Sequence, residues 1–221
     1  MNSNLLHLSR YFGITGISII VGATILTALF YTGRKHERFS LLNHFISELG
    51  EQGVSRLAPV FNSGLIVGGV VLIPFIIGLG LSLDNIWAKL GAFAGIGAAL
   101  GCAAVGVFPM NRLAPHGKAA FTFFRLGLVT ILLFGIAIFA QPADNRIIPL
   151  GANIFSALAV LSYAAFLTLV TRKTVSHETA EALNPEAISE RPRVWLLVIL
   201  EWAIFMTTHL WFLGVALTLP T

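Results

Sequence analysis

Six stretches of the chain are long, apolar and nearly free of charge. They are Phe12–Tyr31, Leu57–Leu81, Ile86–Phe108, Ala119–Ala140, Pro149–Val170 and Val194–Leu217. A run of 18 or more apolar residues is long enough to cross a hydrocarbon core of ~30 Å as a helix. A segment inside the bilayer must satisfy its own backbone hydrogen bonds, and a run of this length does so as an α-helix. The pattern therefore predicts an all-α integral membrane protein, with six transmembrane helices in a single domain over residues 1–221.

A shorter pattern lies in the first loop, between the first two stretches. In FSLLNHFISELG, residues 39–50, apolar residues repeat at helical spacing and polar residues fill the other positions, namely Asn43, His44, Ser47 and Glu48. This spacing predicts a short amphipathic helix that lies on the membrane surface with its apolar face down. Such a helix is either a plain interfacial anchor or one wall of a site.

Glycines indicate which of the predicted helices pack closely. The third stretch holds two pairs of glycines four residues apart, Gly91 with Gly95 and Gly97 with Gly101. The second stretch holds one such pair, Gly64 with Gly68. Small residues at this spacing let two helix backbones approach each other in a bilayer, so we expect the second and third helices to be in tight contact. The longest hydrophilic segment, Thr171–Arg193, is predicted to be a solvated connector.

Composition and charge support a membrane protein and indicate its orientation. Charged residues make up 11% of the chain, against about 25% in soluble domains, so the net charge does not indicate nucleic-acid binding. Eleven of the fourteen Lys and Arg residues flank the first, third and fifth loops, and Arg10, Lys89 and Arg146 lie on the other side. The positive-inside rule then predicts odd loops in the cytoplasm and both termini outside it. Short loops and Ala/Gly-rich helices favour a bacterial inner (plasma) membrane.

Two ionisable residues lie well inside the predicted spans. An ionisable group in hydrocarbon is expensive and is a functional candidate by default. Glu201 lies about 10 Å and Arg125 about 9 Å from the same edge of the bilayer, at 1.5 Å per helical residue. The matched depths predict a buried ion pair between them. The pair would be a structural clamp or part of a site, unless Arg125 extends to the headgroups instead.

Further polar residues fall at similar shallow depth and define a polar zone in the cytoplasmic half of the bundle. Asn62 enters the second helix and His116 starts the fourth, near Ser47 and Glu48 of the first loop. His116 and Arg125 are nine residues apart, which places them on opposite sides of a straight helix. His209, two turns beyond Glu201, is either a buried neutral histidine or a ligand contact.

Metal and nucleophile chemistry have little support. His44 and Glu48 have the i, i+4 spacing of two ligands on one helix face, and His116 and Glu201 would complete four. The sequence has no HExxH motif, no paired histidines and no cysteine cluster, so we expect no metal. Ser47 is a candidate nucleophile beside His44 or His116, without the strained GxSxG turn. No motif indicates a cofactor.

Three sequence patches together resemble one membrane-protein group. ISELGEQGVSRLAPVFNSGLIVGG supplies Ser47, Gly50, Phe61 and Asn62, VGVFPMNRLAPHGKAAFTFF ends its turn in His116, and LEWAIFMTTHLWF carries Glu201 and Trp202. In this order they are similar to the prokaryotic family called domain of unknown function 998 and to the DRAM/Frag/Sfk six-helix group. The resemblance implies a six-helix fold, and its eukaryotic members are associated with remodelling of lipid-anchored proteins, autophagy and membrane lipid homeostasis. Arg125 is not part of the resemblance.

Three functions fit these observations. The first is lipid binding or lipid remodelling, in which the polar zone binds a headgroup or acyl carbonyl, His116 is a general base and Glu201 orients it or a water molecule. The second is a non-enzymatic membrane scaffold or accessory subunit. The third is an ion- or proton-coupled transporter that uses Glu201 and His209. The expected partners are membrane lipids and further membrane subunits or a second copy of the chain, and not nucleic acid.

Overall fold

The computed structural model describes residues 3–172 and 191–219, which contain six long helices and no β-strand. The helices are α1 Ser3–Leu29, α2 Ala58–Ser82, α3 Ile86–Val107, α4 Leu113–Phe139, α5 Ala152–Val170 and α7 Leu196–Thr218, and two short 3₁₀ helices are η1 Ile46–Gly50 and η2 Ala143–Asn145. Each of the six is long and apolar enough to cross a membrane. The prediction of an all-α bundle with six transmembrane helices is confirmed. Most of the predicted connector Thr171–Arg193 lies outside the described residues.

Two helices begin earlier than predicted. The first starts at Ser3 rather than Phe12, and the fourth at Leu113 rather than Ala119. Both extensions carry a cation, Arg10 in α1 and Lys118 in α4. A search for apolar stretches stops at such residues, although a helix continues through them because its hydrogen bonds are made by the backbone.

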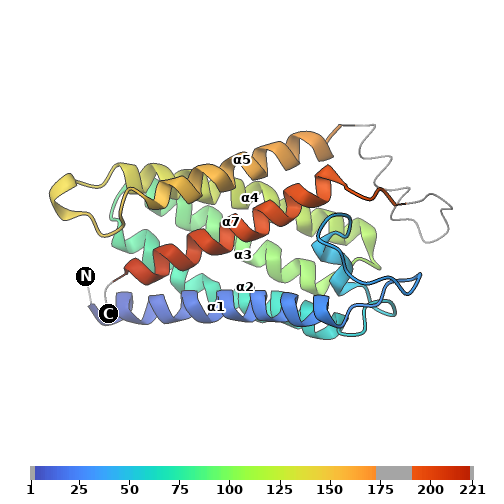
Figure 1. Ribbon diagram of the computed structural model, residues 1–221. Coiled ribbons are helices and arrows are strands. Elements are labelled where there is room, and N and C mark those ends of the chain that lie inside the picture. Colours follow the sequence, from blue (N-terminus) through green and yellow to red (C-terminus); the bar gives the residue numbers. More distant parts are fainter. Residues whose placement is uncertain (1–2, 173–190, 220–221) are drawn as a thin grey trace.

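The helices form a ring in which neighbours in the chain are neighbours in space. α1 packs on α2, α2 on α3, α3 on α4, α4 on α5 and α5 on α7, and α7 closes the ring against α1. Figure 1 shows both termini at one end of the bundle, and the first loop, residues 30–57, at the other. We call this second end the loop end; it also holds the α3–α4 turn and residues 191–195.

Close packing of α2 on α3 is confirmed, but the glycines serve other contacts than expected. A Cβ atom at Gly69 would lie 2.8 Å from the carbonyl oxygen of Ala99 in α3, so this glycine sits at the α2–α3 crossing. Gly64 and Gly68 instead face α1, whereas most of the α3 glycines face α4. A helix inside a bundle has several neighbours, and the spacing of small residues does not say which neighbour each one meets.

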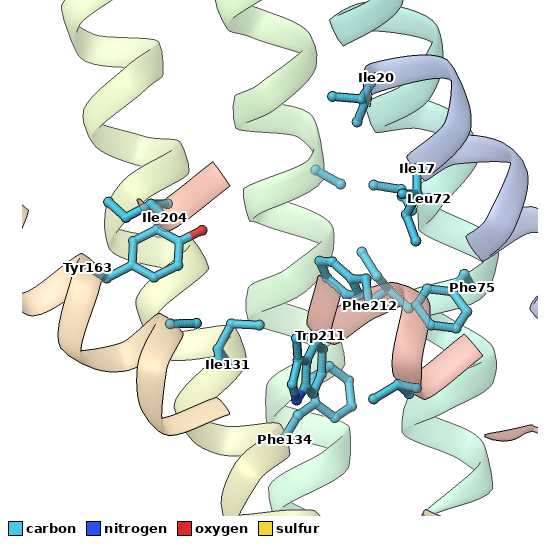
Figure 2. Packing of buried hydrophobic residues seen from close by; sticks show 14 of the residues in the cluster. Ile17, Ile20, Leu72, Phe75, Ile131, Phe134, Tyr163, Ile204, Trp211 and Phe212 are labelled. Atoms are coloured by element: carbon cyan, nitrogen blue, oxygen red, sulfur yellow. The ribbon is translucent and has the colours of Figure 1, made fainter. Parts of the chain in front are cut away.

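The half of the bundle away from the loop end is filled by aromatic side chains. Figure 2 shows Phe134 beside Trp211 and Phe212 beside Phe75, with ring centroids 5.9 Å and 5.7 Å apart. All four side chains are buried. Aromatic pairs at such separations stabilise the packing of the helices that carry them.

The first loop differs most from its prediction. In place of an amphipathic helix over residues 39–50, the chain makes a turn at 41–43 followed by η1. This segment does not lie on its apolar face, because Glu48 is buried together with Ile46 and Leu49 while Leu41 and Leu42 are exposed. The first loop therefore folds into the mouth of the helix ring and closes it.

Candidate functional site

A cavity of about 80 Å³ lies inside the ring, near the loop end. Its lining comes from α1, α2, α3, α4, α7 and η1 and is mostly apolar. Four of the eight candidate residues from the sequence line it: Ser47, His116, Glu201 and His209. Residues that are far apart in the chain thus surround one space, beneath the first loop.

Glu201 joins α7 to the first loop at the wall of this cavity. Its side chain is buried, and its Oε2 atom accepts a hydrogen bond of 2.8 Å from the Ile46 backbone N–H. This bond satisfies a backbone donor at the start of η1, and the Glu48 side chain accepts from the preceding one, the Phe45 N–H. A carboxylate has about four acceptor positions, so Glu201 retains further capacity to bind a group in the cavity.

The two histidines of the cavity share one hydrogen-bonding arrangement. The Nδ1 atom of His116 is 2.8 Å from the Phe108 carbonyl oxygen, and that of His209 is 2.7 Å from the Phe205 carbonyl oxygen. A carbonyl only accepts, so each Nδ1 must carry the proton and each neutral ring has an unprotonated Nε2. An imidazole in this form can take a proton at Nε2.

The predicted ion pair between Glu201 and Arg125 is wrong. Arg125 is exposed on the outer face of α4, with its guanidinium 5.4 Å from the centre of the Phe121 ring. His116, on the same helix, is buried. Equal depth does not fix the direction around a helix axis, and a separation of nine residues sends Arg125 and His116 to opposite faces.

Three other candidates hold the first loop in place and do not line the cavity. The Asn62 amide donates to the Gly50 carbonyl oxygen at 3.0 Å, which fixes the end of η1 on α2. Glu48 accepts from the Phe45 backbone N–H and forms an ion pair with Arg191, both at 2.8 Å. Burial raises the pKa of the Glu48 carboxyl, while the Arg191 guanidinium acts in the opposite direction.

His44 is the third of these and sits in an aromatic cluster. Its Nδ1 atom accepts from the Ser40 backbone N–H at 3.2 Å, and its ring lies edge-on to Tyr31. The Trp202 indole of α7 donates to the His44 carbonyl oxygen at 3.2 Å. Burial, and next the nearby Arg191 charge, lower the pKa of His44, so its ring is held neutral. His44 and Glu48 therefore have separate partners, since the His44 Nε2 atom lies 3.6 Å from a Glu37 carboxylate oxygen and Glu48 pairs with Arg191.

The sequence did not identify Arg191 as a structural residue. In the sequence its positive charge indicates topology alone, and its partner Glu48 is 143 residues away in the chain. Residues 191–195 also meet the first loop through the backbone, since the Trp195 N–H donates to the Leu42 carbonyl oxygen at 2.8 Å. No local signal marks such a contact.

A second, smaller cavity continues toward the middle of the bundle. Its volume is about 50 Å³, and it shares five lining residues with the first: Ile20, Cys102, Phe123, Thr208 and His209. Thr208 donates to the Tyr163 hydroxyl at 3.3 Å on its wall. In the sequence, the polar wall of this second cavity is indicated by Thr207 and Thr208, which directly precede His209. Among the described residues, no three His, Cys, Asp or Glu side chains are grouped so that they could hold a metal.

Comparison with known proteins places this chain in a family. The model of the family described as "Protein of unknown function (DUF998)" matches residues 19–218, which include every residue that lines the cavity. Neither a curated protein nor a solved structure matches the chain. Because the match covers most of the sequence, the chain belongs to the DUF998 family of multi-pass membrane proteins.

Proposed function

We propose that this protein binds a membrane lipid in the cavity beneath the first loop. The cavity of about 80 Å³ would admit only part of the lipid, and we expect the carbonyl or headgroup region to be the part that meets Ser47, His116 and Glu201. The observation that carries the proposal is that one mostly apolar cavity gathers these polar residues from separate parts of the chain. Apolar walls with a few convergent polar groups are the usual form of a small-molecule site.

The orientation of the protein is part of this proposal. The cation-rich loops lie at the loop end of the bundle, where the cavity is. The positive-inside rule would place that end in the cytoplasm, with both termini outside, in a bacterial inner membrane. The ligand would then come from the cytoplasmic leaflet. The resemblance to the DRAM/Frag/Sfk group, with members linked to remodelling of lipid-anchored proteins and to membrane lipid homeostasis, also favours a lipid ligand.

Hydrolysis of the bound lipid is a second candidate function, and the tautomer of His116 favours it. With Nδ1 bonded to the Phe108 carbonyl, Nε2 can take a proton from a water molecule. The resulting hydroxide would add to the acyl carbonyl carbon, the ester C–O bond would break, and His116 would return the proton to the leaving alcohol. Glu201 would orient the water. This step assigns no role to Ser47, whose hydroxyl donates to the Met110 sulfur at 3.8 Å.

The structure favours transport and a pure scaffold less. A proton path through Glu201 and His209 would have to cross the aromatic half of the bundle, where Phe75, Phe134 and Trp211 are buried. A scaffold needs polar groups that hold helices together, and Asn62 and Glu48 do so. It does not need a cavity lined by two histidines with unprotonated Nε2 atoms.

Lipid retention tests the proposal. The wild-type protein, purified with its native lipids in mild detergent, should carry a lipid species that Ala120→Phe lacks, because Ala120 lines the cavity and a phenyl ring would fill it. Ala157→Phe is the matched control, since Ala157 is exposed on α5. Mass spectrometry of the extracted lipids gives the readout. Equal retention by wild type and Ala120→Phe would refute binding in this cavity.

The same samples test hydrolysis. Vesicles of phosphatidylglycerol and phosphatidylethanolamine supply the substrate, and released fatty acid is measured. If His116 is the base, His116→Ala should reduce release by about 10²–10⁴-fold, while His36→Ala, at an exposed position, should not. Full release from folded His116→Ala and Glu201→Gln proteins would leave lipid binding as the function.

A further inference from the structure

The outer face of α4 has a groove that the cavity does not explain. It is lined by Lys118, Phe121, Thr122, Arg125 and Leu126 and has a volume of about 550 Å³. All five residues belong to α4, and the groove shares none of them with the internal cavity. It therefore faces the surroundings of the protein.

The two cations of the groove lie on one side of the helix. Lys118 and Arg125 are seven residues apart, which is ~20° short of two full turns. The Arg125 guanidinium lies 5.4 Å from the centre of the Phe121 ring, one turn closer to the loop end than its own Cα atom. Lys118 is three residues beyond Phe121 in the same direction. Lys118, Phe121 and Arg125 thus follow one another along the same side of α4.

Neither cation has an anionic partner in the described chain. Helix α4 contains no Asp or Glu residue, and no carboxylate of residues 3–172 or 191–219 lies within 4.0 Å of Lys118 or Arg125. Both side chains are exposed. A pair of unpaired cations on a membrane helix leaves room for an anion from outside the protein.

The depth of the groove identifies the source of that anion. α4 has 27 residues and is therefore ~40 Å long, longer than a hydrocarbon core of ~30 Å. Both charged residues of α4 lie in its first half, so we place the excess length at the loop end, in the headgroup layer. Lys118 is in that region, and Phe121 and Leu126 continue toward the hydrocarbon. A bound molecule must be anionic at one end of the groove and apolar at the other.

We propose that this groove binds an anionic phospholipid from the leaflet at the loop end. The phosphate would lie between the Lys118 ammonium and the Arg125 guanidinium, whose planar N–H groups match phosphate oxygens. An acyl chain would run along Phe121 and Leu126. The contact with Phe121 holds Arg125 in the binding orientation before the lipid arrives. This site is separate from the cavity and does not depend on its function.

Native mass spectrometry of the full chain in zwitterionic detergent tests the proposal, with dioleoyl phosphatidylglycerol as the anionic probe and dioleoyl phosphatidylcholine as the neutral one. Wild type should bind the anionic lipid preferentially. K118Q/R125Q should lose about tenfold or more in apparent affinity for it, from the attraction expected of two interfacial cations. The matched control is R56Q/R172Q, which removes two exposed charges at the same end and should lose much less.

Charge-preserving K118R/R125K should recover part of the affinity, and it shows whether the loss comes from the charges or from a disturbed helix. Equal losses in K118Q/R125Q and R56Q/R172Q would overturn the proposal, since they would mean general attraction to a positive surface. Equal binding of the two lipids to wild type would overturn it as well. Ala120→Phe fills the cavity but leaves the groove intact, so it should keep the preference for phosphatidylglycerol even if cavity binding fails.

Discussion

Arg191→Leu is expected to lower the free energy of unfolding by about 3–5 kcal/mol at pH 8, the range for a buried ion pair that loses one partner. The Glu48 side chain is 3% exposed and its Arg191 partner 27% exposed, so the loss would leave a buried carboxylate without compensation. Arg191 also donates to the Asn43 carbonyl oxygen at 3.0 Å, and that acceptor would lose its partner. Thermal unfolding in detergent, followed by circular dichroism, measures the effect.

The loss of unfolding free energy in Arg191→Leu should become smaller as the pH falls. Burial already raises the pKa of Glu48 above its ordinary value of 4.5, and removal of Arg191 takes away the influence that opposes this. Between the pKa of Glu48 in the unfolded chain and its higher pKa in the folded variant, the folded variant binds more protons than the unfolded chain. The stability of the variant therefore falls as the pH rises through that window. Arg193→Leu, two residues away at an exposed position, is the control and should change little. Equal midpoints for Arg191→Leu and Arg193→Leu at pH 8 would show that the ion pair is not structural.

Gly69→Leu should destabilise the bundle by about 1–3 kcal/mol or more, the range for overpacking a tight interior. A Cβ atom at this position would meet the Ala99 carbonyl oxygen at 2.8 Å and the Ala103 amide nitrogen at 3.2 Å. Both obstacles are backbone atoms, so α2 and α3 would have to separate. The midpoint of thermal unfolding is the measurement.

Gly22→Leu provides the comparison for this change. A Cβ atom at Gly22 would have no atom within 4 Å, so the same substitution there adds only an exposed apolar side chain. Its midpoint should stay within a few degrees of wild type. If both leucine variants lose the same stability, the loss comes from helix glycines in general and the tight α2–α3 crossing is not its cause.

The sequence was enough to predict the six helices, because the property that defines them is local. The length and apolarity of each stretch, together with the need to satisfy the backbone in lipid, leave one solution. The direction of a side chain around its helix is not local, since it depends on which helices become neighbours. Depth along the helix therefore placed Glu201 and His116 correctly near one end, and the same reasoning failed when it paired Glu201 with Arg125.

The first loop shows the same limit in another form. Its apolar spacing is that of a surface helix, and this spacing would be decisive if the loop met only the membrane. The loop instead meets Arg191, Trp195 and Trp202 from the distant end of the chain, and these contacts bury Glu48. The burial of Glu48 is explained by its partner Arg191, which the sequence around the first loop does not contain.

Cys102 offers the most direct test of the idea that the gathered polar residues face a space open to lipid. It is the only cysteine of the chain, and it lines both internal cavities. The rate at which a small thiol reagent labels delipidated protein in detergent should fall when the native lipid extract is added back, and labelling of Ala120→Phe should be slow with or without lipid. A labelling rate that neither added lipid nor Ala120→Phe changes would contradict a lipid-occupied cavity at this site.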